Sequence, residues 1–201
     1  DNPEIAAARM AGIPVFERAQ AWGVIMRNYK NAVCISGTHG KTTTSSMAAH
    51  LLHQSKVGCN AFLGGISKNY GTNLLLSDTS EYVVIEADEF DRSFHWLTPY
   101  ATVITSTDAD HLDIYGTEEA YLESFSHYTS LILPGGALIM REGIRLQPRL
   151  QEGVRLYTYS TQSGDFHAEN IRIGGGEIIF DYVSPLGDIR DVQLGVPVAI
   201  N

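Results

Sequence analysis

A short segment near position 40 combines the residue types that bind a nucleoside triphosphate. An apolar run at residues 33–35 leads into a turn bounded by Gly37 and Gly40, and Lys41 and Thr42 follow at the start of an expected helix. Glycines allow backbone N–H groups to approach phosphate oxygens, and a helix N-terminus adds partial positive charge. The lysine can reach the β- and γ-phosphates, and the threonine hydroxyl can ligate Mg²⁺. An ordinary strand–turn–helix corner would leave the lysine and the clustered threonines unexplained, so the candidate ATP-binding residues are Gly37, Thr38, His39, Gly40, Lys41, Thr42 and Thr43.

An acidic cluster follows a second apolar run, at residues 82–85. Its four carboxylates, from Glu86, Asp88, Glu89 and Asp91, would repel one another without a cation. A carboxylate at a strand end beside a phosphate loop is a common Mg²⁺ ligand. Taken alone, such a run is more often a solvated acidic loop. Its position after a second strand of the same domain favours a metal-binding role.

A third polar cluster groups Asp108, Asp110 and Asp113 around His111. Taken by itself, this spacing is equally consistent with a polar turn in which Asp side chains cap the backbone. Residues 113–116 also match the D-x-x-G pattern of GTPases, but no N-K-x-D segment, which reads the base, occurs in the chain. The sequence therefore disfavours a GTPase.

These clusters require strands whose ends meet at one edge of a sheet. The sequence predicts strands at residues 32–36, 57–63, 82–85, 101–105 and 136–140, and helices at residues 5–11, 16–29, 42–54 and 117–133. Continuous apolar runs such as residues 82–85 are typical of buried parallel strands. The alternation predicts an α/β fold, a P-loop-type, doubly wound and mostly parallel sheet with ligands beyond the carboxyl ends of its strands.

The pattern changes after residue 150. Short strands are expected at residues 154–159, 166–173, 177–183 and 189–194, with no helix between them. Turn signals such as the glycines at 174–176 separate these strands. The region is predicted to form a C-terminal antiparallel β meander attached to the parallel sheet.

Composition restricts the class of protein. The 201 residues suit one domain, or one domain with a remnant of another. The 44% hydrophobic content is ordinary for a globular core, and no stretch approaches the ~20 apolar residues of a membrane span. A formal net charge of −9 argues against nucleic-acid binding through a broad basic surface. The start of the chain has no signal-peptide pattern, and two cysteines without metal-ligand spacing predict reduced, structural thiols in a cytoplasmic protein.

The three polar clusters together resemble the Mur ligases, cytoplasmic enzymes that add amino acids to peptidoglycan precursors. G-T-H-G-K-T-T at residues 37–43 resembles their shortened ATP loop, and E-A-D-E at 86–89 and D-A-D-H-x-D-x-Y-G at 108–116 resemble their metal-binding segments. The resemblance implies catalytic roles for Lys41, Glu86 and His111, and metal-ligand roles for Thr42, Glu86 and His111. Mg²⁺ is the expected ion, and Mn²⁺ should also be accommodated, because histidine is an unusual partner for Mg²⁺.

The resemblance also implies roles outside these clusters. Residues 64–73 match the loop near the muramyl substrate, where Lys68 and Asn69 would contact the substrate carboxylate or phosphates. Asn201 falls at the position of the asparagine that contacts adenine. Residues 1–30 would be the end of an N-terminal UDP-binding domain and its linker, and residues 31–201 the central ATP-binding domain. The C-terminal amino-acid-binding domain would lie outside this chain.

The loop with a histidine at position 39 resembles the loop of the family branch that acts on UDP-N-acetylmuramate. No lysine follows position 68, so the carbamylated lysine of several family members has no counterpart, which fits the branch that adds L-alanine. The implied substrates are UDP-N-acetylmuramate and L-alanine, joined through an acyl phosphate with ATP, and no nucleic-acid or membrane partner is expected. The alternatives are a murein-recycling ligase that adds a tripeptide to the same sugar nucleotide, and an ATP-dependent switch or binding module.

Overall fold

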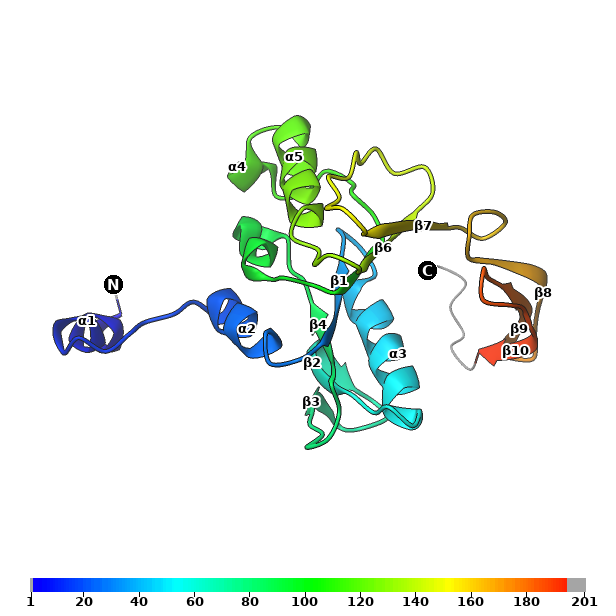
Figure 1. The fold of residues 1–201 in the computed structure, drawn as a ribbon, viewed down its shortest axis with the longest axis horizontal. Coiled ribbons are helices and arrows are strands. Elements are labelled where there is room, and N and C mark those ends of the chain that lie inside the picture. The colour runs from blue at the N-terminus through cyan, green and yellow to red at the C-terminus, as the bar shows by residue number, and fades with distance from the viewer. Residues whose placement is uncertain (1, 195–201) are drawn as a thin grey trace.

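The computed structural model describes residues 2–194. Its main body is a seven-stranded sheet in the order β3-β2-β4-β1-β5-β6-β7, and every neighbouring pair is parallel except β2 and β3 (Figure 1). The strands are β1 (Asn31–Ser36), β2 (Asn60–Ser67), β3 (Thr72–Leu75), β4 (Tyr82–Glu86), β5 (Ala101–Ile104), β6 (Ala137–Arg141) and β7 (Arg155–Tyr159). The helices are α1 (Pro3–Met10), α2 (Arg18–Met26), α3 (Lys41–Gln54), the 3₁₀ helix η1 (Phe90–Trp96), α4 (Leu112–Tyr115) and α5 (Glu118–Thr129). The predicted mostly parallel α/β sheet is confirmed.

The central strands are buried on both faces. Val83, Val84 and Ile85 of β4 are at most 1% exposed. Because side chains alternate across a strand, Val83 and Ile85 join the larger core, with residues of η1 and α5, whereas Val84 joins the smaller core, with Ala49 of α3. The unbroken apolar run in the sequence therefore reflects helices covering both faces of the sheet.

The register of the central strands brings the three polar clusters to one edge of the sheet. Ile35 of β1 lies opposite Glu86 of β4, and Ser36 lies opposite Ile104 of β5. The segments that follow these strands leave the sheet at its carboxyl edge, where ligands of open α/β sheets bind. Residues far apart in the sequence thus become neighbours.

Strand β2 departs from the prediction at both ends. It begins at Asn60 rather than at residue 57, and it continues through Gly64 and Gly65 before a turn leads into β3, a strand that the sequence analysis misses. The prediction of a loop at residues 64–73 is therefore wrong for most of its length. Paired glycines usually mark a turn, but here the missing Cβ of Gly64 lets the strand pass close to Glu86.

The C-terminal region contains a separate antiparallel sheet in the order β10-β9-β8, which confirms the predicted meander (Figure 1). Its strands are β8 (His167–Gly174), β9 (Glu177–Val183) and β10 (Ile189–Leu194). The strand expected at residues 154–159 does not belong to it, because β7 pairs in parallel with β6 and extends the main sheet. The connection at residues 142–154 replaces the crossover helix that parallel strands usually require, and its Leu146 is 5% exposed within the larger core.

Helix α2 is packed against the main domain although it precedes the first strand. Met26 is 1% exposed, and the rings of Trp22 and Phe62 have centroids 4.1 Å apart. A Cβ on Gly23 would lie 2.3 Å from the backbone oxygen of Trp96, so only glycine permits this approach. In contrast, α1 has no buried residue and lies apart from the sheet in Figure 1.

Cys34 and Cys59 are free and buried, as expected for structural thiols, and burial raises the pKa of Cys34 to about 12. That thiol is therefore protonated near neutral pH and a poor nucleophile. Within residues 2–194, no helix has the length and apolar character needed to cross a membrane.

Candidate functional site

The segment from Gly37 to Gly40, here called the phosphate loop, is a tight turn between β1 and α3. The two glycines have φ angles of 127° and 81°, which residues with a Cβ rarely adopt. A Cβ on Gly37 would also lie 2.3 Å from Thr105 Oγ1. Both glycines are therefore required by the course of the chain, and they leave the backbone open to close approach by a ligand.

Residues at the end of β5 hold the phosphate loop in place. The N–H of His39 donates to Ser106 Oγ (3.0 Å), and the N–H of Thr38 donates to the Ser106 carbonyl oxygen (3.2 Å). The Thr38 hydroxyl donates to the carbonyl oxygen of Asp108 (2.7 Å), whereas the side chain of His39 is exposed. Thr105 and Ser106 are not among the residues expected from the sequence, although a run of hydroxyl residues directly after an apolar strand is a usable signal.

Helix α3 begins at Lys41, immediately after the phosphate loop. Its first N–H groups, including those of Thr42 and Thr43, have no acceptor within the helix. These groups and the helix dipole form a site suited to an anion. The structure thus brings the predicted nucleotide-binding residues 37–43 together around one helix start.

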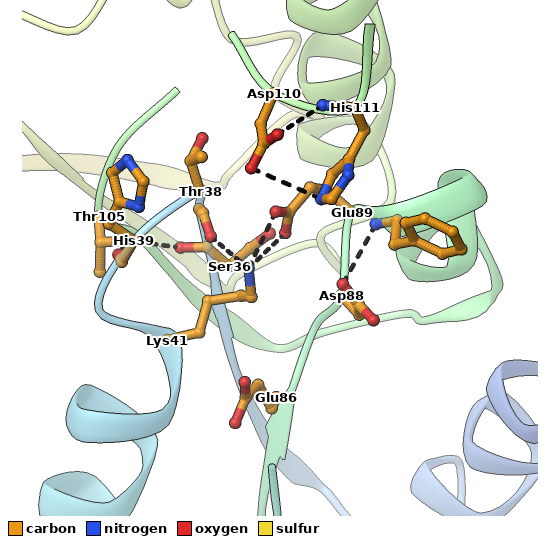
Figure 2. Close-up of polar contacts among 12 residues, drawn as sticks. Ser36, Thr38, His39, Lys41, Glu86, Asp88, Glu89, Thr105, Asp110 and His111 are labelled. Carbon is orange, nitrogen blue, oxygen red and sulfur yellow. Dashed lines mark hydrogen bonds and ion pairs between the residues drawn. The ribbon is translucent and has the colours of Figure 1, made fainter. Parts of the chain in front are cut away.

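The Lys41 ammonium group is anchored on both sides. Its Nζ donates to the carbonyl oxygen of Gly37 (2.8 Å) and to Glu89 Oε1 (2.9 Å), and it lies 2.8 Å from Glu89 Oε2. Figure 2 shows Lys41 extending across the phosphate loop toward Glu89, with Glu86 on the opposite side. The lysine is therefore held over the loop by the protein itself.

Glu86 and Thr42, both predicted metal ligands, are brought together. The Thr42 hydroxyl donates to Glu86 Oε1 (2.9 Å), and the N–H of Gly64 donates to Glu86 Oε2 (2.9 Å). A Cβ on Gly64 would lie 2.4 Å from that same oxygen, so the strand β2 shapes a cradle for the carboxylate. Hydroxyl and carboxylate oxygens are the ligands that Mg²⁺ prefers, and this donor set fits that ion.

The other carboxylates of the acidic cluster are separated by their contacts. Glu89 is 1% exposed and pairs with Lys41, whereas Asp88 Oδ1 accepts from the N–H of Phe90 (3.2 Å) and Asp91 is exposed. Burial raises the pKa of Glu89, and its hydrogen bond to Lys41 opposes that effect. The repulsion expected from the sequence is thus relieved for Glu86, Asp88 and Glu89 by different partners, whereas Asp91 is exposed to solvent.

His111 does not join the Thr42–Glu86 pair. The backbone N–H of His111 donates to Asp110 Oδ1 (2.7 Å), and its side-chain Nε2 lies 3.7 Å from Asp110 Oδ2. Its ring meets the Phe90 ring edge-on, with the ring centroids 5.1 Å apart. Figure 2 places His111 on the Glu89 side of Lys41, with Glu86 well separated. Within residues 2–194, no three His, Cys, Asp or Glu side chains are grouped so as to hold a metal ion. The role of His111 as a metal ligand stays a prediction.

Two cavities of about 310 and 320 Å³ lie beside these groups. Both are lined by Arg18 and Trp22 of α2 and by Glu86 and Asp88, and the first also reaches Lys41. Arg18 and Trp22 are not expected from the sequence, because an arginine and an aromatic residue on a helix before the first strand form no recognisable pattern. Their position depends on the docking of α2.

The predicted substrate residues lie elsewhere. Lys68 and Asn69 occupy the turn between β2 and β3, where Lys68 is exposed and Asn69 Nδ2 lies 3.3 Å from His50 Nδ1. Neither residue lines the two cavities. Asn201, expected to contact adenine, lies outside the described residues.

Comparisons with known proteins agree with this geometry. The family model described as Mur ligase middle domain matches residues 35–198. A UDP-N-acetylmuramate–L-alanine ligase of Phocaeicola vulgatus is 72% identical over 200 residues, which cover 100% of this chain and 43% of that protein. A protein of the same name from Parabacteroides distasonis is 63% identical over 201 residues, again 100% of this chain and 43% of that protein.

A solved structure is similar as well. UDP-N-acetylmuramate-alanine ligase MurC from Thermotoga maritima has a TM-score of 0.79 and 27% identity, over 98% of this chain and 44% of that chain. The chain therefore spans less than half the length of these relatives. The family match includes the phosphate loop, the acidic cluster and the His111 segment. The chain belongs to the Mur ligase middle-domain family.

Proposed function

We propose that the protein is an ATP-dependent ligase that joins L-alanine to the lactoyl carboxylate of UDP-N-acetylmuramate. The observation that carries this proposal is the anchored Lys41 above the phosphate loop, at the sheet edge that also opens into the two cavities. The 72% identity to a ligase of that name favours this substrate pair over the tripeptide-adding alternative and over an ATP-dependent switch. The reaction would take place in the cytoplasm, where ATP is available.

The first step forms an acyl phosphate. The lactoyl carboxylate oxygen attacks the γ-phosphorus of ATP, a P–O bond to the carboxylate forms, and the bond to the β-phosphate oxygen breaks to release ADP. Lys41 and the N–H groups at the start of α3 stabilise the charge on the transferring group. Catalysis then consists mainly of positioning and electrostatic stabilisation.

The second step forms the amide bond. The amine of L-alanine attacks the acyl carbon, a tetrahedral intermediate forms and loses a proton from nitrogen, and the C–O bond to phosphate breaks. The amino-acid site would be supplied by the C-terminal domain, and residues 1–30 would connect to the UDP-binding domain. Residues 31–201 would be the ATP-binding domain of the full-length protein.

We assign the metal site to Thr42 and Glu86, whose oxygen atoms fit Mg²⁺. A bound Mg²⁺ would neutralise charge on the phosphate oxygens. His111 is proposed as a ligand for a second ion, for which Mn²⁺ also suits the imidazole nitrogen. Asp110 Oδ2 lies 3.7 Å from His111 Nε2 and would be the neighbouring oxygen ligand for that ion.

The substrate side of the site is assigned to the cavities beside Lys41. Arg18 lines both of them, and no ion pair involves it within residues 2–194. A guanidinium group there suits the anionic groups of UDP-N-acetylmuramate. Lys68 and Asn69, in the turn between β2 and β3, are proposed to contact the carboxylate or the phosphates of the substrate.

The test is an assay of ADP release by the full-length protein. Release that requires both UDP-N-acetylmuramate and L-alanine, with one amide formed per ADP, is the expected result. Release that requires the tripeptide instead would identify a recycling ligase. ADP release without either acceptor, or nucleotide binding without turnover, would indicate a switch or binding module.

A further inference from the structure

The ion pair between Lys41 and Glu89 is the most protected charged contact of the site. The Lys41 side chain is 16% exposed and that of Glu89 is 1% exposed. Another Lys–Glu pair of this chain, Lys30 with Glu81, has side chains that are 75% and 55% exposed. Water screens an exposed pair and weakens it, whereas a buried carboxylate without its cation is strongly unfavourable. Glu89 therefore depends on Lys41, and Lys41 cannot leave it freely.

The chain around Glu89 is shaped to keep its carboxylate at this position. The Tyr115 hydroxyl donates to the backbone oxygen of Glu89, and the guanidinium of Arg92 lies 4.6 Å from the centre of the Tyr115 ring. Asp91 and Arg92 have φ angles of 48° and 57°, in the left-handed region that non-glycine residues rarely adopt. Such strain persists only where surrounding contacts enforce it, and it is common at functional sites.

The contacts of the Lys41 ammonium group fix its direction. An ammonium group has three donors, and two are used by the Gly37 carbonyl oxygen and by Glu89 Oε1. Two anchors from different strand ends therefore fix the direction of Nζ. The other oxygen of Glu89, Oε2, is also buried and lies 2.8 Å from Nζ, so both carboxylate oxygens face the ammonium group.

We propose that Glu89 is a positioning residue, which holds Lys41 aligned over the phosphate loop before and during phosphoryl transfer. This inference rests on the proposed use of ATP at the loop. Because Glu89 carries negative charge beside the phosphate site, it opposes the binding of ATP while it orients the lysine for the transition state. Its removal should therefore lower kcat without weakening the binding of ATP.

The decisive experiment compares Glu89→Gln with Glu81→Gln in the full-length protein. Glutamine keeps the shape of the side chain and removes its charge. We expect Glu89→Gln to lower kcat about 10- to 100-fold, with the dissociation constant for Mg-ATP unchanged or lower. Glu89→Asp, which keeps the charge, should recover part of kcat, and Glu81→Gln should leave both quantities unchanged. A kcat within twofold of wild type, or a parallel loss of ATP affinity, would overturn the proposal.

A second variant covers the case in which Glu89→Gln does not fold, as judged by thermal unfolding. Tyr115→Phe removes the hydrogen bond that holds the Glu89 backbone and keeps the ion pair. It should lower kcat by about three- to tenfold at constant ATP affinity, since misalignment of a catalytic group reduces turnover. Unchanged kcat in both Tyr115→Phe and Glu89→Asp would then refute the positioning role.

A readout without ligation separates this inference from the proposed function. The rate at which an amine-reactive reagent labels Lys41, followed by mass spectrometry, reports how firmly Nζ is held. Labelling should be at least about threefold faster in Glu89→Gln than in wild type, because the buried acceptor is lost, and unchanged in Glu81→Gln. If wild type binds Mg-ATP but does not ligate the named substrates, the proposed function fails. Equal labelling in wild type and Glu89→Gln refutes the role of Glu89 instead.

Discussion

At the scale of single residues, each group of the site has a contact that defines its task. Lys41 spans the phosphate loop, Glu86 is held by Thr42 and by the backbone of Gly64, and Glu89 is buried against the lysine. Lys41 and Glu89 share one ion pair, whereas Glu86 is held by separate contacts with Thr42 and Gly64. Substitutions of the individual residues should therefore have different kinetic signatures.

The first prediction concerns Lys41. Lys41→Ala in the full-length protein should lower turnover at least about 100-fold, because one preorganised charge-stabilising group is lost. Steady-state ADP release measures the effect. Lys30→Ala, which removes an exposed lysine of an ion pair, serves as the control and should remain near wild type. Turnover of Lys41→Ala within a few-fold of wild type would rule out this loop as the catalytic phosphate site.

The second prediction concerns Gly64. A Cβ there would lie 2.4 Å from Glu86 Oε2, so Gly64→Ala should displace the carboxylate from Thr42. We expect the Mg²⁺ concentration for half-maximal activity to rise about tenfold, as is typical when support for a metal ligand is lost. Gly174→Ala, at a glycine with no neighbour within 4 Å, is the matched control. The same Mg²⁺ dependence in both variants would show that Glu86 does not hold the ion.

At the scale of secondary-structure elements, one carboxylate organises the C-terminal antiparallel sheet. Asp181 on β9 accepts hydrogen bonds from Asn170 Nδ2 (2.7 Å), Arg190 Nη1 (2.8 Å) and the N–H of Asp191 (2.9 Å). Asn170 and Asp191 have positive φ angles of 51° and 54°, and the strand register shifts at both places. Asp181 thus holds an irregularity in each neighbouring strand.

The third prediction follows from the pKa of Asp181, which these hydrogen bonds hold well below the ordinary value of 3.8. Because the folded pKa is depressed, the carboxylate contributes stability that is fully present above pH 3.8 and is lost as the pH falls below it. Asp181→Asn should reduce hydrogen-exchange protection of β8–β10 at pH 7, and its difference from wild type should shrink toward pH 3. The exposed Asp78→Asn is the control. A difference independent of pH would contradict the assignment.

At the scale of the whole molecule, the chain holds the phosphate loop and the cavities but spans 43% of the length of its relatives. Two clusters of buried hydrophobic residues, one on each side of the central strands, give this chain its own core. The domains that bind the UDP group and the amino acid are proposed to lie mostly outside this chain. A folded chain without ligase activity is the expected combination.

The fourth prediction concerns residues 1–201 produced alone. They should fold, because the sheet and its helices bury their own core. They should bind Mg-ATP only weakly, since such sites are completed by domain closure, and they should form no amide bond, because two bound substrates are no longer held together. Calorimetry and a ligation assay with UDP-N-acetylmuramate and L-alanine test both parts. Measurable ligation would show that the substrate sites are misassigned.

The sequence by itself determined the elements whose signals are local. Continuous apolar runs at β1, β4 and β5 predicted buried parallel strands, and glycines followed by a lysine predicted the phosphate loop. Both patterns depend on the conformation and burial of adjacent residues. Local conformation and burial are what residue type and periodicity report, so these predictions agree with the structure.

The tertiary structure alone decided which groups meet. It paired Glu89 rather than Glu86 with Lys41, brought Arg18 to the cavities, and placed His111 apart from Thr42. It also made β7 a parallel strand of the main sheet, because the connection at residues 142–154 packs on the core as a helix would. Such pairings depend on strand register and on the docking of distant segments, and neither leaves a periodic signal in the sequence.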